Sequence, residues 1–98
     1  MKQVRLLPKA SDDLVNIWLY IARDSEFHAT RYLDRLEAVI GQLSTLSGAG
    51  RLRADVSEKG VRGYPEGSHV IFYVIERDVV EVLRIVHSAQ DIRKIEWR

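Results

Sequence analysis

The segment that decides the fold is residues 69–87, which reads HVIFYVIERDVVEVLRIVH. It contains two runs rich in β-branched and aromatic residues, His69–Glu76 and Val79–His87, separated by the polar pair Arg77-Asp78. Two such runs joined by a two-residue polar turn are typical of a β-hairpin. We therefore predict an antiparallel pair of long strands in the second half of the chain.

Alternate side chains of a strand share one face of the sheet, and in this hairpin both faces are apolar. Parity divides the first strand into Val70, Phe72 and Val74 against Ile71, Tyr73 and Ile75, and the second into Val80, Val82 and Val86 against Leu83 and Ile85. An antiparallel sheet that is covered by helices on one side usually shows water a polar second face. We therefore expect a cover on the second face: the C-terminal segment with Ile92, Ile95 and Trp97, a second copy of the chain, or a partner segment.

Upstream of the hairpin, the sequence first favours a strand and then a helix. Residues 3–7 alternate and stop at Pro8, which cannot donate to a sheet ladder, so we predict a short first strand. Ser11 is the predicted N-cap of a helix, with Asp12 and Asp13 in the first turn, where carboxylates complement the helix dipole.

Apolar residues at helical spacing predict two helices in this half of the chain. The two stripes consist of Leu14, Ile17, Trp18 and Ile21, and of Ala29, Leu33, Leu36, Ile40, Leu43 and Leu46. The second helix is expected to start near Ser25 or Glu26 and to end at Gly48. Because the break between the helices is short, they are predicted to form an antiparallel hairpin.

The remaining segments are short. Residues 48–60 are predicted to be mostly loop with strand character at their end, and Val61–Tyr64 to be a strand that stops at Pro65. Residues 91–97 are expected to form a last helical turn or a tail. The order predicts a single α+β domain over residues 1–98, with an N-terminal strand and a helical hairpin packed on an antiparallel sheet completed by three C-terminal strands.

Composition narrows the function classes. The net charge is only +1, from 15 basic and 14 acidic residues, so bulk charge favours no polyanionic partner. The chain has no cysteine, which excludes thiolate metal sites, and its three histidines are scattered. No phosphate loop, nucleophile elbow or carboxylate pair stands out, so no cofactor, metal or catalytic site is predicted. Without an apolar leader or a membrane-spanning run, a cytoplasmic location is expected.

Beyond these patterns, the second half carries a family motif. Arg62 precedes a turn rich in Pro and Gly, then comes an aliphatic–aromatic–Tyr strand, and Arg84 and His87 occupy the last strand ahead of Asp91. In order and spacing this resembles the ParE family of the ParE/RelE toxin superfamily. Looser matches in the helices, such as Asp13-Leu14, extend the resemblance to essentially the whole chain.

The resemblance implies the RelE/ParE-like fold and the toxin half of a type II toxin–antitoxin system, as used in plasmid stabilisation. It implies a ParD-like antitoxin, whose disordered C-terminal segment folds onto the toxin in a hetero-oligomer. The implied target is DNA gyrase, trapped on cleaved DNA so that replication stops. The toxin alone is not expected to bind nucleic acid sequence-specifically. A scaffold that has lost its toxicity and acts only in a repressor complex is a further alternative.

The related RelE branch instead cuts mRNA inside the ribosome, which requires basic side chains and an acid or base near the phosphate. The positions where RelE-like proteins place basic residues fall near Val70 and Ala89, and the tail has no tyrosine. We therefore predict that the chain is not an enzyme. The alternative, a ribosome-dependent mRNA endonuclease, would depend on Arg84 and His87.

Six residues are candidates for contacts to the target or antitoxin: Arg62, Tyr64, Arg84, His87, Asp91 and Trp97. Each also has a structural interpretation. Arg84 lies in an apolar strand and needs an acidic partner, either Asp91 or an antitoxin carboxylate. His87 and Asp91 are interpreted as a capping or hydrogen-bonding pair. The only basic concentration, Arg51, Arg53, Lys59 and Arg62, is interpreted either as a surface for gyrase or DNA or as a solvated loop.

Overall fold

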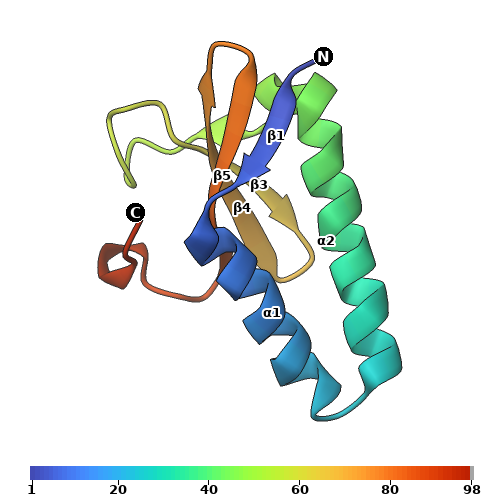
Figure 1. The fold of residues 1–98 in the computed structure, drawn as a ribbon. Helices are drawn as coiled ribbons and strands as arrows, with labels where there is room; N and C mark the ends of the chain where they lie inside the picture. Colours follow the sequence, from blue (N-terminus) through green and yellow to red (C-terminus); the bar gives the residue numbers. More distant parts are fainter. Residues whose placement is uncertain (98) are drawn as a thin grey trace.

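The computed structural model describes residues 1–97 and confirms the α+β class (Figure 1). Two helices, α1 (Pro8–Ala22) and α2 (Glu26–Leu46), form an antiparallel hairpin against one face of a sheet. The sheet has the strand order β1-β5-β4-β3-β2. Its strands are β1 (Gln3–Leu6), β2 (Arg51–Leu52), β3 (Arg62–Glu66), β4 (His69–Glu76) and β5 (Val79–His87), and short 3-10 turns occupy Ser47–Ala49 and Ile92–Lys94.

The predicted β4–β5 hairpin is present, and its turn places Arg77 in the left-handed region at φ 55°. β3 pairs antiparallel with β4, and β2 with β3. The sheet is nevertheless mixed, because β1 runs parallel to β5. Parallel neighbours need a long crossover connection, and here the helical hairpin and strands β2 to β4 supply it.

A β-bulge in β5 corrects the predicted faces. Tyr73 lies opposite Val82 and Phe72 lies opposite Arg84, which leaves Leu83 as the extra residue. The bulge reverses the alternation, so Ile85 joins Val80 and Val82 beneath the helices, whereas Leu83 and Val86 pack on the outer face. The parity-based assignment was therefore right as far as Leu83 and wrong for Ile85 and Val86.

The N-terminus of α1 also differs from the prediction. The helix begins at Pro8 with Leu7 as its N-cap, so Ser11 is not the cap and Asp13 lies beyond the first turn. Proline is favoured at the first helical position because its missing N–H is not needed there. The predicted start of α2 is confirmed, since the Ser25 hydroxyl accepts a hydrogen bond from the His28 amide.

The segment between α2 and β4 shows two further differences. Strand character lies at the beginning of the expected loop, at β2, rather than at its end. The strand predicted to stop before Pro65 instead continues through it to Glu66. Pro65 lies beyond the short β2, where β3 is an edge strand, and proline is tolerated at such an edge.

The helix-covered face holds the larger core. Its buried residues are Ala10, Leu14, Leu33, Leu36, Ile40, Leu43, Ile71, Tyr73, Val80, Val82 and Ile85. The Tyr73 hydroxyl donates to the Ser47 carbonyl (2.6 Å) and accepts from the Gly50 amide (2.8 Å), so this buried ring fixes the turn that follows α2. Neither helix in residues 1–97 has the length and apolar character needed to cross a bilayer.

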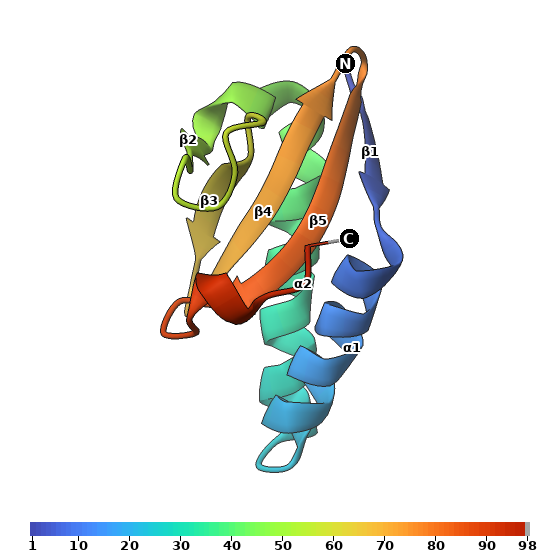
Figure 2. The same ribbon diagram turned by 90° about the vertical axis from the view of Figure 1, so that its left-hand side faces the viewer.

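The outer face carries a second cluster of Val61, Phe72, Val74, Leu83 and Val86, and the chain's own C-terminal tail packs on it (Figure 2). Trp97 meets the Phe72 ring edge-to-face, with 4.9 Å between ring centroids. The Glu96 carbonyl accepts from Arg84 (2.6 Å), and the Glu96 carboxylate pairs with Lys9 (2.8 Å). Of the covers considered for the second face, the C-terminal segment is therefore present.

Candidate functional site

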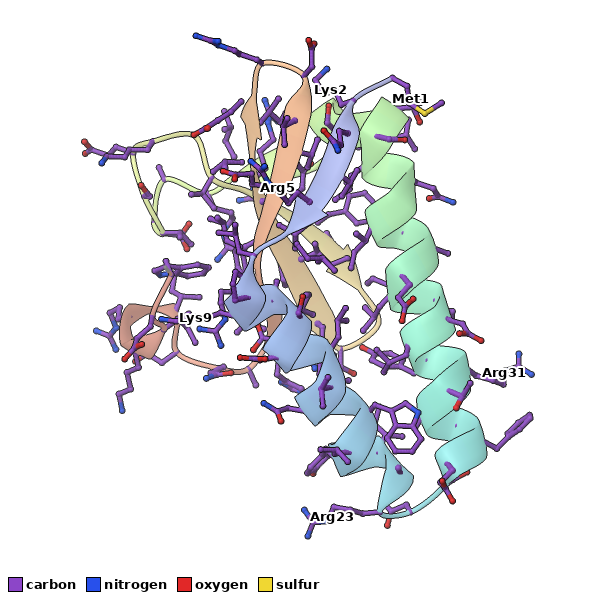
Figure 3. All side chains as sticks on the ribbon, in the orientation of Figure 1. Met1, Lys2, Arg5, Lys9, Arg23 and Arg31 are labelled. Atoms are coloured by element: carbon purple, nitrogen blue, oxygen red, sulfur yellow. The ribbon has the colours of Figure 1, made fainter. Side chains whose placement is uncertain are left out.

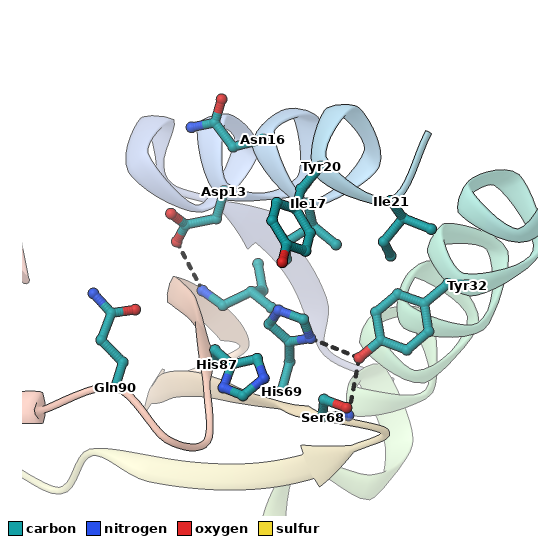
Figure 4. Close-up of a pocket in the computed structure, with 11 residues that line it drawn as sticks. Asp13, Asn16, Ile17, Tyr20, Ile21, Tyr32, Ser68, His69, His87 and Gln90 are labelled. Atoms are coloured by element: carbon teal, nitrogen blue, oxygen red, sulfur yellow. Dashed lines mark hydrogen bonds between the residues drawn. The ribbon is translucent and has the colours of Figure 1, made fainter. Parts of the chain in front are cut away.

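The helical hairpin projects beyond the end of the sheet, so the last turns of α1 and the first turns of α2 have no strand beneath them (Figures 1 and 2). A cleft of about 590 Å³ opens at this step, between the hairpin and the adjoining ends of β4 and β5. Its lining residues are Asp13, Asn16, Ile17, Tyr20, Ile21, Tyr32, Ser68, His69, Ile85, His87 and Gln90 (Figure 4).

The apolar wall of the cleft continues the core stripe of α1. Leu14 is buried against the sheet, but Ile17 and Ile21, one and two turns further on, line the cleft instead. On the sheet side, Ile85 faces them because the bulge has turned it toward the helices. The predicted apolar stripe of α1 therefore extends past the sheet and lines the cleft at its end.

Two imidazoles form the floor of the cleft. His69 and His87 are directly opposed in the β4–β5 register, and their ring centroids lie 5.3 Å apart. The Nδ1 atom of His69 lies 2.6 Å from the Tyr32 hydroxyl oxygen. That oxygen also accepts from the Ser68 amide (3.0 Å) and lies 3.4 Å from the Glu66 carbonyl oxygen. These bonds fix the orientation of the Tyr32 and His69 rings.

Burial lowers the pKa of His69, and repulsion from His87 lowers it further, with a smaller opposing effect from Asp13. His69 is therefore neutral at pH 7. Burial also raises the pKa of Tyr32, so its hydroxyl stays protonated. The Tyr32–His69 pair thus presents uncharged hydrogen-bonding groups to the cleft.

Asp13 closes one end of the cleft and corrects the predicted partner of Arg84. Its carboxylate accepts from Arg84 Nε and Nη2, both at 2.8 Å, and from the Ile85 amide at 2.9 Å. These hydrogen bonds raise the pKa of Arg84. β1 ends opposite Val82, so Asp13 satisfies the next free amide along the edge of β5. The prediction that Arg84 pairs with Asp91 was wrong.

Asp91 and His87 do not form the expected hydrogen bond. Asp91 instead caps the Ile92–Lys94 turn and forms a bidentate ion pair with Arg93, at 3.0 and 2.9 Å. The Nδ1 atom of His87 accepts from the Ala89 amide at 3.1 Å. Both are local contacts of the turn that follows β5.

The other predicted contact residues lie apart from the cleft. Arg62 donates to the Gly50 carbonyl (2.7 Å), Tyr64 packs against the helix-side core, and Trp97 lies on the outer face. Of the six candidates, the cleft brings in only His87 among its lining residues. It adds His69 and Tyr32, which the sequence analysis missed as functional candidates.

Local contacts engage two residues of the basic concentration, Arg53 and Arg62. Arg53 forms a bidentate ion pair with Asp55 and lies over the Phe72 ring, 5.2 Å from its centroid. Arg62 is turned toward backbone carbonyls, and Arg51 and Lys59 remain exposed. Across residues 1–97, no group of three or more His, Cys, Asp or Glu side chains is arranged to hold a metal ion.

Comparison with known proteins places the chain in a family. The model of the ParE toxin of the type II toxin–antitoxin system parDE matches residues 4–92. A solved structure described as the chromosomal ParDE TA system from P. aeruginosa has a similar fold, with a TM-score of 0.74 and 18% identity over 89% of this chain and 96% of that chain. No curated protein matches the sequence. Because the family model spans nearly the whole chain, the protein belongs to the ParE toxin family of type II toxin–antitoxin systems.

Proposed function

We propose that this chain is an active toxin that is neutralised by a ParD-like antitoxin and blocks replication by binding DNA gyrase, without chemistry of its own. The observation that carries the proposal is the family match over residues 4–92. Toxin and antitoxin would form a hetero-oligomer in the cytoplasm, where gyrase acts.

The environment of Arg84 supports binding rather than RNA cleavage. An arginine has five N–H donors, and Arg84 uses Nε and Nη2 on Asp13 and Nη1 on the Glu96 carbonyl. A guanidinium engaged in this way is poorly placed to stabilise a phosphate in flight. Arg84, on which the RNA-cleaving alternative would depend, is therefore already engaged by groups of the toxin itself.

Exposed apolar side chains on the hairpin support an antitoxin partner. Val15, Leu19, Tyr20 and Phe27 are all more than half exposed and lie on the two helices of the hairpin. Large apolar side chains left exposed in this way are candidates for an interaction surface. Since the tail already covers part of the outer sheet face, we place the antitoxin contact at the hairpin rather than on that face.

The direct test is a pair of assays on purified toxin. We expect loss of gyrase supercoiling and accumulation of cleaved DNA–gyrase complexes, both prevented by prior addition of the antitoxin. Supercoiling at the rate seen without toxin, with no added cleaved complex, would refute the gyrase target. In cells, induction should cause filamentation and DNA-damage signalling.

One observation supports a second candidate function, that of a ribosome-dependent mRNA endonuclease. His69, His87 and Tyr32 place acid–base groups together in one cleft. Codon-positioned mRNA cuts that disappear in His87→Ala would establish this activity. Intact mRNA after induction would remove it.

A further inference from the structure

The strand β5 extends past its neighbour at one edge of the sheet. β1 ends at Leu6, opposite Val82, whereas β5 continues to His87. The last part of β5, Leu83–His87, therefore has β4 on one side and no strand on the other. Main-chain N–H and C=O groups that point outward from such an edge remain available to pair with another chain.

Two main-chain groups of this edge lack partners within residues 1–97. The Ile85 N–H points away from β4, because it donates to the Asp13 carboxylate (2.9 Å), and every second residue of an antiparallel strand has the same orientation. His87 therefore also directs its N–H outward, and its carbonyl already accepts from the Gln90 amide at 2.9 Å. Along Ile85–His87 this leaves one acceptor, the Ile85 carbonyl, and one donor, the His87 amide.

The free edge lies in a groove that is long enough for an extended chain. The cleft adjoins a second hollow of about 390 Å³, and the two share Asp13, Asn16 and Gln90. Together they follow the open side of β5, with α1 as the opposite wall, from Lys9 near the start of this helix toward Arg23 at its end (Figure 3). The space is therefore elongated along the strand.

The opposite edge of the sheet is protected, whereas this one is not. There β3 also extends past its short neighbour β2, but Pro65 removes an N–H from that overhang. Proline is a common means of preventing another strand from pairing with an edge. β5 has no proline between Leu83 and His87, so its overhang keeps the groups that a further strand needs.

We propose that an extended segment of the antitoxin lies in this groove and adds a strand to β5, donating to the Ile85 carbonyl and accepting from the His87 amide. The proposal rests on the antitoxin partner of the proposed function. A helix bonds its own N–H and C=O groups internally, so a free strand edge selects an extended chain. Because side chains alternate along a strand, every second residue of the segment would face Ile17 and Ile21, which favours aliphatic residues there.

The first test measures amide hydrogen exchange in the unmodified toxin, alone and bound to the antitoxin encoded beside the toxin gene. The His87 amide should exchange fast in the free toxin and at least about tenfold more slowly in the complex. The Ile85 amide is the internal control, since its bond to Asp13 protects it in both states. An equal exchange rate of the His87 amide in both states would overturn the proposal.

The second test removes the donor itself. His87→Pro and His87→Ala both delete the exposed imidazole, but only the proline deletes the N–H. Because this N–H faces away from β4, the β4–β5 pairing should persist in both variants, which melting curves check. By calorimetry we expect His87→Pro to bind the antitoxin at least about tenfold more weakly than His87→Ala (tenfold is 1.4 kcal/mol). Equal affinities of two folded variants would overturn the proposal, and the exchange measurement decides if the proline variant unfolds.

The outcomes separate this inference from the proposed function. Antitoxin binding that leaves the exchange of the His87 amide unchanged removes the added strand but leaves the antitoxin partner standing. Failure of the unmodified toxin to bind the antitoxin removes both. Protection of the His87 amide in toxin alone that increases with toxin concentration would show that a second copy of the chain pairs with this edge, and would also overturn the proposal.

Discussion

The two faces of the sheet are both apolar, but they are covered in different ways. On the inner face, α1 and α2 provide two long helices whose side chains interlock with β4 and β5. On the outer face, a tail with a single 3-10 turn is attached by a few residues, notably Trp97 and the Glu96 carbonyl. The difference shows that an apolar strand face predicts a cover, but not how strongly that cover is held.

The inner face should show the largest loss of stability. Leu36 is fully buried in α2, so Leu36→Ala should destabilise the protein by about 2–5 kcal/mol because it removes packed atoms and leaves a cavity. Leu46→Ala is the matched control, since Leu46 is 52% exposed and should change stability by less than about 0.5 kcal/mol. Urea unfolding measures both. Similar values for the two variants would contradict the assignment of the core.

The next largest loss of stability is expected at the Asp13–Arg84 ion pair, which lies between the two faces of the sheet. Asp13→Ala leaves the Arg84 charge without a carboxylate partner and the Ile85 amide without its acceptor, and both side chains of the pair are largely buried. We expect a loss of about 2–4 kcal/mol by urea unfolding. Arg5→Ala removes an arginine whose side chain is 61% exposed from its pair with Glu81, and it should cost less than Asp13→Ala. If Asp13→Ala cost no more than Arg5→Ala, the Asp13–Arg84 pair would not connect the two faces of the sheet.

A smaller loss is expected on the outer face. Trp97→Ala removes the edge-to-face contact with Phe72 and should cost about 1–2 kcal/mol. Trp97→Phe should recover part of this by keeping an aromatic ring there. Amide exchange should accelerate in residues 92–97 but not in α2. Faster exchange in α2 would mean that the two covers are coupled.

The smallest effect is a dependence on pH. Since the folded-state pKa of His69 is lowered, mainly by burial, the unfolded chain binds its proton more readily than the folded chain. This contribution to stability is present above the unfolded pKa of about 6.5 and is lost as the pH falls below it. The melting temperature should therefore decrease from pH 7.5 to pH 5.5, and less so in His69→Gln. An equal decrease in both proteins would show that other groups cause it.

Much of the fold follows from pattern alone. The two-residue turn at Arg77-Asp78 determines the hairpin, and apolar spacing determines both helices. The start of α1 was misplaced because two signals competed: Ser11 is a good cap, but Pro8 is also a favoured first helical residue. That choice decided whether Asp13 lay in the first turn of the helix or faced β5.

The cleft was harder to predict because it depends on the bulge. A regular two-residue turn would place His69 opposite Val86, and the extra residue Leu83 moves it opposite His87. Alternating apolar residues on both faces fit either register equally well. The sequence therefore shows both histidines but does not show that they lie opposite each other.

The bulge at Leu83 also determines which face of the sheet each later residue of β5 occupies. Without the bulge, Arg84 would lie opposite Ile71 and direct its charge beneath the helices, while Ile85 would turn outward. Removing Leu83 itself would leave every later pairing unchanged. We therefore expect relatives to tolerate a one-residue gap at this point of an alignment, and to reject an insertion or deletion between Ile85 and His87, where it would rotate the histidine away from its partner.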